Sequence, residues 1–509
     1  MGGYTLQGNN NDGVSSYIRG FDILGPKILA FGNSETLQSR SVKSSSTLIS
    51  YLSRLNYAYK DRYLLTATFR RDGSSRFGAE SRFANFGSAA IGWKISEEAF
   101  FDDLTFIDDA KIRASIGRTG SNSIPDFIAK PSLSPVRHSF GTSQVSGVIN
   151  ADPGNINLTW ETSDQMDVGI DLIMFDNGVN LTLDYYNNTT SGLLLNKQIP
   201  YSSGYPNGYL TNIGEMRNSG FELSTNIRVL NKNDLKWEVG GNVTRNYNKV
   251  LDLGGAEQVQ KWYGVLRHVP GMEYKQLYGV KALGVARQGD GSGVTAGDYI
   301  FLDADGDGLI GSFVDPDGVP LGSPNQDWIF GFNTNIQYRN FMLSALLHGQ
   351  SGAVMQDFNL IQWQNGANHR NVSKEFHYEG RYIDESNPGD GETGRAGALV
   401  TSASGVGSVS SIGIQKTDYL RIKNIMLSYD MVSMLNKYGL GEASVFVSVE
   451  NLFTFTKFIG GNPDAVNGSI GPLGPSRLEG VYDGREIGVQ VIASQPLPRI
   501  FTLGVNLSF

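Results

Sequence analysis

The last residues of the chain, 500–509, alternate strictly between two kinds of side chain. Five apolar residues share one face of an extended strand: Phe501, Leu503, Val505, Leu507 and Phe509. Four small uncharged residues occupy the other face: Thr502, Gly504, Asn506 and Ser508. A soluble sheet rarely leaves such a strand unprotected, because its open edge templates aggregation. In a membrane barrel, lipid covers the outer face, water wets the inner face and the edge is paired. The pattern therefore predicts a membrane-spanning strand.

The same period of two recurs along the chain. It is found in these stretches: 49–59, 63–69, 89–95, 112–116, 166–174, 179–185, 221–229, 237–243, 330–338, 341–347 and 445–449. We expect about 14 or 15 strands of about 9–13 residues each, a length that suits a tilted membrane crossing. The sequence therefore predicts an all-β fold, a transmembrane antiparallel β-barrel.

Turn signals divide the chain in a way that fits this fold. Tight turns are expected at four places: 60–62, 176–178, 231–234 and 339–340. Long loops are expected near 120–160, 190–217, 286–326, 351–415 and 456–496. Short turns on one side and long loops on the other are typical of outer-membrane barrels.

Composition excludes several other classes. No apolar run approaches 18 residues, so a transmembrane helix is not expected. The net charge is −8 and there is no basic stripe, which argues against nucleic acid as a partner. Glycine is abundant, 63 of 509 residues, which suits strands joined by turns and long loops. The alternative for the fold is a soluble all-β protein such as a sandwich or an adhesin array, whose strands are usually shorter, about 5–6 residues.

Catalytic motifs are missing from the sequence. The five histidines are scattered and there is no cysteine. We find no nucleophile elbow, zinc-protease motif, P-loop or dinucleotide fingerprint. We therefore expect no enzyme activity.

Eight segments resemble, in order, signatures of one transporter family. They are residues 69–78 (FRRDGSSRFG), 92–98 (GWKISEE), 112–121 (IRASIGRTGS), 212–223 (NIGEMRNSGFEL), 297–308 (GDYIFLDADGDG), 419–429 (YLRIKNIMLSY), 449–457 (VENLFTFTK) and 496–499 (PLPR). Together they span most of the chain. The sequence resembles the SusC/RagA family of TonB-dependent outer-membrane transporters.

The resemblance implies a barrel of about 22 strands that encloses a plug. Residues 1–509 correspond only to its C-terminal part; the signal peptide, TonB box, plug and first strands have no counterpart here. It also implies a Gram-negative, Bacteroidetes-type outer membrane, with membrane lipid and lipopolysaccharide around the barrel. The implied protein partners are a SusD-like surface lipoprotein, the TonB complex acting through the plug, and the N-terminal part of the same transporter. We therefore expect that this chain cannot form the transporter alone.

The implied function is energised import of a bulky nutrient. The family resemblance favours an oligosaccharide as substrate, with an oligopeptide imported by the same mechanism as the alternative. A passive porin, or a surface structural or adhesive barrel, is the alternative from another class. In each case inward residues such as Arg113, Asp167 and Asp171 would line the lumen, and outward residues such as Ile227 and Val447 would meet lipid.

Residues 303–308 (DADGDG) match the first half of a calcium-binding loop. The candidate calcium ligands are Asp303, Asp305, Asp307, Leu309 (through its carbonyl) and Asp315. The twelfth position is Val314 rather than a bidentate glutamate, and Asp315 or Asp317 would have to substitute. The alternative is an acidic turn held by Asx hydrogen bonds without a metal. Calcium is the one cofactor that the sequence suggests.

Aromatic and amide side chains are frequent in the predicted long loops. Flat rings stack on sugars and amides pair with hydroxyls, although the same residues also bind peptides. The candidate substrate residues are Tyr201, Tyr205, Tyr209, Trp262, Tyr263, Trp363, His369 and Arg370. The alternative role for each is packing within a loop or in the aromatic girdle of the barrel.

Overall fold

The fold is built almost entirely from β-strands. The computed structural model describes residues 1–19, 33–141, 143–197, 199–205, 208–261, 266–308, 310, 317–357, 380–395, 410–431, 442–464, 489–490 and 497–508. Within these ranges the only helices are short 3-10 turns: η2 (Ile95–Glu97), η3 (Ala99–Phe101), η4 (Tyr201–Ser203) and η6 (Ser411–Gly413). No helix in this part of the chain is long and apolar enough to cross a membrane.

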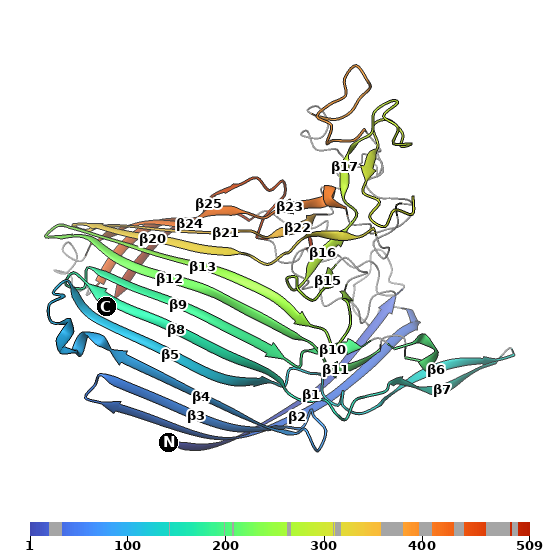
Figure 1. Cartoon of the computed structure of the whole chain (residues 1–509), viewed down its shortest axis with the longest axis horizontal. Coiled ribbons are helices and arrows are strands. Elements are labelled where there is room, and N and C mark those ends of the chain that lie inside the picture. Colours follow the sequence, from blue (N-terminus) through green and yellow to red (C-terminus); the bar gives the residue numbers. More distant parts are fainter. Residues whose placement is uncertain are drawn as a thin grey trace. The chain divides into compact units, whose positions relative to one another are not determined.

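One large sheet holds 14 strands, and neighbours in the sheet follow one another along the chain (Figure 1). Its members, in sheet order, are β1 (Gly2–Arg19), β2 (Asn33–Tyr59), β3 (Tyr63–Ser74), β4 (Phe83–Lys94), β5 (Ile107–Ser121), β8 (Glu161–Met174), β9 (Val179–Ser191), β12 (Glu215–Lys232), β13 (Leu235–Asp252), β20 (Trp328–Tyr338), β21 (Phe341–Ser351), β24 (Tyr419–Asp430), β25 (Glu442–Thr456) and β27 (Ile500–Ser508). The registers known for its neighbouring strands are antiparallel, for example β13 with β20 and β25 with β27. This order is an up-and-down meander.

Smaller sheets lie in the long connections. Their strands are β6 (Ser132–Phe140), β7 (Ser143–Asp152), β10 (Leu194–Lys197), β11 (Tyr209–Asn212), β14 (Val259–Lys261), β15 (Leu266–His268), β16 (Gln276–Gly279), β17 (Ala282–Val285), β18 (Tyr299–Phe301), β19 (Val319–Gly322), β22 (Val354–Asp357), β23 (Ile414–Lys416) and β26 (Val489–Gln490). They form the sheets β6-β7, β10-β11, β14-β15-β16-β19, β17-β18 and β23-β22-β26. The long connections therefore carry secondary structure of their own.

The chain divides into two compact units. The first comprises Met1–Trp93, Arg113–Asp167 and Asn188–Glu215, and the second comprises Lys94–Ile112, Val168–Asn187 and Met216–Phe509. The first has an apolar cluster in which Phe77, Leu158 and Trp160 are buried. The second has two small clusters, one around Leu266 and Leu277 and one around Val285, Tyr299 and Tyr382. Each unit therefore has buried apolar contacts beyond those of the large sheet.

The predicted strands and tight turns are confirmed. The 14 strands of the large sheet agree with the expected number, and turns occur at each of the four predicted tight connections. Several of these turns need left-handed backbone, as at Lys60 (φ 51°), Asn177 (φ 58°) and Arg339 (φ 54°). Short polar residues and glycine tolerate this conformation best.

The lengths of several strands differ from the predicted range. Strand β2 runs for 27 residues, and β1, which the alternation did not indicate, runs for 18. These two strands pair from Gly2 with Ser53 to Arg19 with Asn33, with a register shift after Tyr17. Most of β1 and the first half of β2 are polar on both faces, so the period of two is absent although the backbone is extended. The predicted range of about 9–13 residues was therefore wrong for these strands, because it counted only the stretch with one apolar face.

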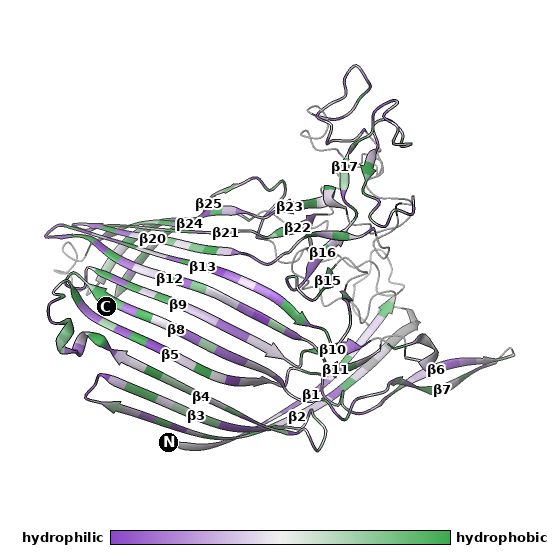
Figure 2. Cartoon of the chain, viewed as in Figure 1, coloured by the Kyte–Doolittle hydropathy of each residue, from purple (hydrophilic) through white to green (hydrophobic). Residues whose placement is uncertain are grey.

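Strands β25 and β27 show how the two faces of the sheet differ. Val445 pairs with Val505, Val447 with Leu503 and Val449 with Phe501, all on one face. These side chains are exposed, with 71% of Phe501 and 75% of Leu503 accessible. The opposite face pairs Ser448 with Thr502, and Asn506 donates a hydrogen bond to Ser444. Figure 2 shows the same alternation as coloured bands along the strands of the large sheet. An exposed apolar sheet face is the surface expected to meet lipid. Phe509 lies outside the described residues.

Candidate functional site

The inner, polar face of the large sheet carries paired charges. In the first unit, Arg113 Nη1 on β5 lies 3.3 Å from Asp167 Oδ1 on β8. In the second unit, Lys111 Nζ lies 3.8 Å from Asp171 Oδ2 on the same two strands. These four residues project from the face opposite the apolar residues Ile112 and Ile170. The structure thus brings the predicted inward residues of β5 and β8 together as cross-strand ion pairs.

A buried arginine on β24 organises a second polar cluster, which the sequence analysis missed. Arg421 is 2% exposed and its ring partner is Tyr419, with the guanidinium 4.7 Å from the ring centre. Its three nitrogens donate to Thr454 Oγ1 (3.0 Å), Asp464 Oδ2 (3.2 Å) and Asn462 Oδ1 (2.7 Å). These contacts fasten the segment after β25 to the inner face of the sheet. The one sequence signal for this role is the alternation in β24: Arg421 lies between the apolar residues Leu420 and Ile422, which predicts that its side chain projects from the polar face.

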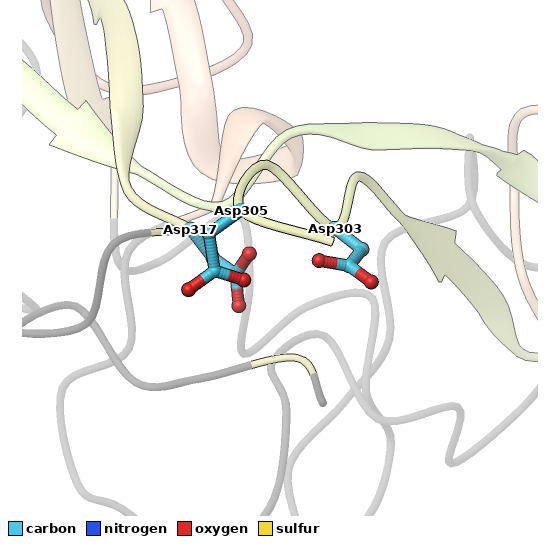
Figure 3. A group of neighbouring side chains, drawn as sticks. All are labelled: Asp303, Asp305 and Asp317. Carbon is cyan, nitrogen blue, oxygen red and sulfur yellow. The ribbon is translucent and has the colours of Figure 1, made fainter. Parts of the chain in front are cut away.

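The predicted calcium loop is a compact acidic turn in the second unit. One carboxylate oxygen each of Asp303, Asp305 and Asp317 lies within 4.8 Å of the others (Figure 3). The loop is held by its own backbone: Asp303 accepts hydrogen bonds from the N–H groups of Gly306 (2.7 Å) and Gly308 (2.9 Å). Asp317 is 1% exposed and accepts from the N–H of Ala304 at 2.8 Å. Leu309 and Asp315 lie outside the described residues. The third carboxylate of this group is therefore Asp317, and Asp307 is in the turn but not in the group.

Calcium binding by this acidic cluster stays a prediction, and a titration tests it. The N–H of Asp307 lowers the pKa of Asp305, but burial and the carboxylates of Asp307, Asp317 and Asp303 together raise it above its ordinary value. A cation would relieve this repulsion, so we expect calorimetry to detect calcium binding that weakens as the pH falls.

In the same titration, Asp303→Ala should abolish the heat of calcium binding. The matched control is Asp290→Ala, which removes another turn-forming aspartate that holds the N–H groups of Arg287 and Ser292. Equal heats for the wild type and Asp303→Ala would leave the Asx-turn interpretation standing.

Most of the predicted substrate residues cannot be placed. Trp262, Tyr263, Trp363, His369 and Arg370 lie outside the described residues. Tyr201 begins η4, and its side chain is likewise outside the description. Two candidates belong to the first unit: Tyr205 follows η4, and Tyr209 begins β11, where it pairs with Lys197. Both are only partly exposed, so their role in binding substrate stays a prediction.

Comparison with known families decides what kind of protein this is. The family described as TonB dependent receptor-like, beta-barrel matches residues 2–452. The chain belongs to this TonB-dependent receptor β-barrel family. The SusC/RagA resemblance noted from the eight segments is confirmed by the relatives and solved structures described next.

Two curated relatives illustrate the match. TonB-dependent receptor P3 of Formosa agariphila is 31% identical over all of this chain and 50% of its own length. TonB-dependent receptor SusC of Bacteroides thetaiotaomicron is 30% identical over 91% of this chain and 44% of its own length. The chain thus spans about half the length of the curated relatives it matches.

Solved structures share the fold. The RagAB peptide importer in its open-open state superposes with a TM-score of 0.80 at 20% identity, covering 100% of this chain and 52% of that chain. Its closed-closed state gives a TM-score of 0.78. At this identity the likeness concerns the fold alone. The large antiparallel sheet has the fold of a TonB-dependent barrel.

Proposed function

We propose that the chain forms part of the barrel wall of a TonB-dependent outer-membrane transporter of the SusC/RagA type, and that this transporter imports an oligosaccharide. The family match over residues 2–452 is the observation that carries the proposal. The two-faced sheet supports it, because a transporter wall must be apolar toward lipid and polar toward its water-filled interior.

The barrel wall encloses the transport path and carries out no reaction in this proposal. Cross-strand pairs such as Arg113 with Asp167 keep charged groups on the inner face without leaving them unpaired. Energy would come from TonB acting on a plug, and capture of the substrate from a SusD-like lipoprotein at the surface. Both partners, and the rest of the barrel, belong to this proposal.

A peptide is the second candidate substrate, because a solved structure with the same fold is that of the RagAB peptide importer. SusC is a relative at similar coverage, so the fold does not separate the two classes. Aromatic rings and amides serve either ligand.

Growth on defined polymers tests the function and names the substrate class. We expect deletion of the gene to abolish growth on one oligosaccharide or polysaccharide and to leave growth on its monosaccharide unchanged. Reintroduction of the wild-type gene is the control. Loss of growth on peptides alone would replace the glycan with a peptide, and a strain with no defect on any polymer would contradict import.

Dependence on TonB separates active import from the porin alternative. Uptake of the identified substrate should fall to background when TonB is removed. A passive porin would continue to pass its substrate down the gradient under the same conditions.

A further inference from the structure

A groove lies in the second unit where β20, β21, β24 and β25 reach the ends that join the long connections. Its volume is about 780 Å³, and its apolar lining is formed by Phe330, Leu420, Phe453 and Phe455. Leu420 pairs with Phe455 across β24 and β25, and Phe453 pairs with Ile422. Phe453 and Phe455 remain 46% and 53% exposed. These large side chains therefore form an accessible apolar floor.

This floor belongs to the outward, apolar face of the sheet. Phe330 alternates with Phe332, which is exposed on the same face of β20. Gly349 pairs with both Phe330 and Leu420, and the next residue on its face is Leu347. Arg421 and Thr454, which alternate with the floor residues, point to the inner face and bond to each other there. The apolar floor thus belongs to the face that a barrel presents to lipid. The groove is also lined by residues that alternate with the floor residues: Gln350, Tyr419, Thr454 and Thr456.

Glycine and an irregular register make room for the groove. A Cβ at position 349 would collide with the Phe330 ring and with the Tyr419 carbonyl oxygen. The register of β24 with β25 shifts between Ile422 and Asn424. Glycine at 349 therefore lets the Phe330 ring lie against the backbone of the neighbouring strands.

Two lysines lie at the end of this apolar floor where the strands join the long connections. Lys416 and Lys457 line the groove and are exposed, and no ion pair within the described residues holds either ammonium group. Ser351 and Thr456 also line it, and the Thr456 hydroxyl donates to the carbonyl oxygen of Asp418 at 2.7 Å. The one acidic group in the lining, Asp418, accepts a hydrogen bond from the N–H of Gly352 at 2.8 Å. The groove therefore joins an apolar surface to a net positive end.

The middle of the neighbouring outward strand face is uncharged. On β13 and β20, the outward residues Val243, Val239 and Trp237 and the residues that pair with them are uncharged. The first charge is Arg245, which lies over the Trp328 ring at 4.7 Å and pairs with Asp327 at 3.5 Å. Trp328 in turn pairs with Ser351 of the groove. Basic and aromatic residues at this level are typical of the interface between lipid chains and headgroups.

We propose that the groove binds a phosphorylated lipid of the surrounding leaflet, with an acyl chain on the aromatic floor and a phosphate between Lys416 and Lys457. Charge complementarity selects an anionic headgroup, since each cation near a membrane surface attracts such lipids. The inference rests on the proposed function, which fixes the orientation of the barrel in the membrane. The long connections then face the outside of the cell, so the lipid is the phosphorylated lipid A part of lipopolysaccharide. A bound lipid would fix the level of the barrel in the membrane.

Native mass spectrometry of the complete transporter that contains this chain tests the proposal. The probe is bisphosphorylated lipid A, added to the purified transporter in detergent. We expect the double variant Lys416→Gln/Lys457→Gln to bind it about 25-fold more weakly, at roughly fivefold per cation. The matched control, Lys232→Gln/Lys236→Gln, removes two exposed lysines at the opposite, hairpin end of β12 and β13 and should bind as the wild type does.

Further arms separate the lipid from other sources of phosphate. Dephosphorylated lipid A should bind the wild type and the groove variant alike, and inorganic phosphate should not displace the lipid. Unchanged lipid A binding in the groove variant, or displacement by inorganic phosphate alone, would overturn the proposal. Substrate uptake is measured on the same proteins. Failure of import in the wild type would contradict the proposed function, whereas the difference in lipid A binding between the wild type and the groove variant would still test whether the groove binds the lipid.

Discussion

Replacing Arg421 with methionine is expected to lower the free energy of unfolding of the transporter by about 3 kcal/mol. The guanidinium is 2% exposed and has three hydrogen-bond acceptors and a ring partner. Its loss leaves Asn462 buried and Asp464 without its cation. Because Asp464 is itself 38% exposed, water can solvate its carboxylate in the variant. The expected loss of stability is therefore at the lower end of the range for breaking a buried ion pair.

Thermal unfolding and hydrogen exchange measure this effect together. The amides of residues 458–464 should lose protection in Arg421→Met, because the arginine ties this segment to β24. The control is Lys423→Met on the same strand, whose ammonium has one long hydrogen bond, 3.3 Å to Asn451. Equal destabilisation by both variants would show that Arg421 does not organise the cluster.

A charge on the outward face is the second substitution with a large expected effect. Ile227→Arg places a cation among the apolar outward residues of β12 and should cost about 2–4 kcal/mol if the site lies near mid-membrane. Its neighbour Asn226 faces the other way, so Asn226→Arg adds the same charge to the polar side. We expect this second variant to fold with little loss.

Urea titration of the complete transporter refolded into lipid bilayers compares the two variants. The account predicts a lower urea midpoint for Ile227→Arg and a nearly unchanged one for Asn226→Arg. A sheet with water on both faces would tolerate both arginines equally, and that outcome would contradict a lipid-facing surface.

The sequence predicted the elements in which one face differs from the other. Strands β3, β9, β12, β20, β21 and β27 all contain the alternating stretches, because contact with lipid demands an apolar residue at every second position. The tight turns followed from their short polar residues, as at Asp176 and Asn177. Strand β1 was missed because most of it is polar on both faces, and a strand without a continuous apolar face leaves no period of two in the sequence.

The site was harder to predict than the fold, for a physical reason. Asp303 and Asp305 are close in sequence and form a recognisable turn, but Asp317 reaches them only through the fold of the loop. Arg421 meets Asn462 and Asp464, 41 and 43 residues later, through a connection whose path no local pattern encodes. The groove beside Gly349 likewise combines residues of five strands (β20, β21, β23, β24 and β25), and within each strand these residues follow the ordinary barrel pattern.

Site-directed spin labelling of β12 tests the central claim, the two-faced wall, most directly. The chain has no cysteine, so single cysteines at positions 221 to 228 of the membrane-embedded transporter carry the only labels on it. We predict that accessibility to lipid-soluble oxygen peaks at Phe221, Leu223, Thr225 and Ile227, and that accessibility to a water-soluble nickel complex peaks at the residues between them. Accessibilities that show no period of two, or that rise and fall together for both reagents, would contradict a sheet with lipid on one side and water on the other.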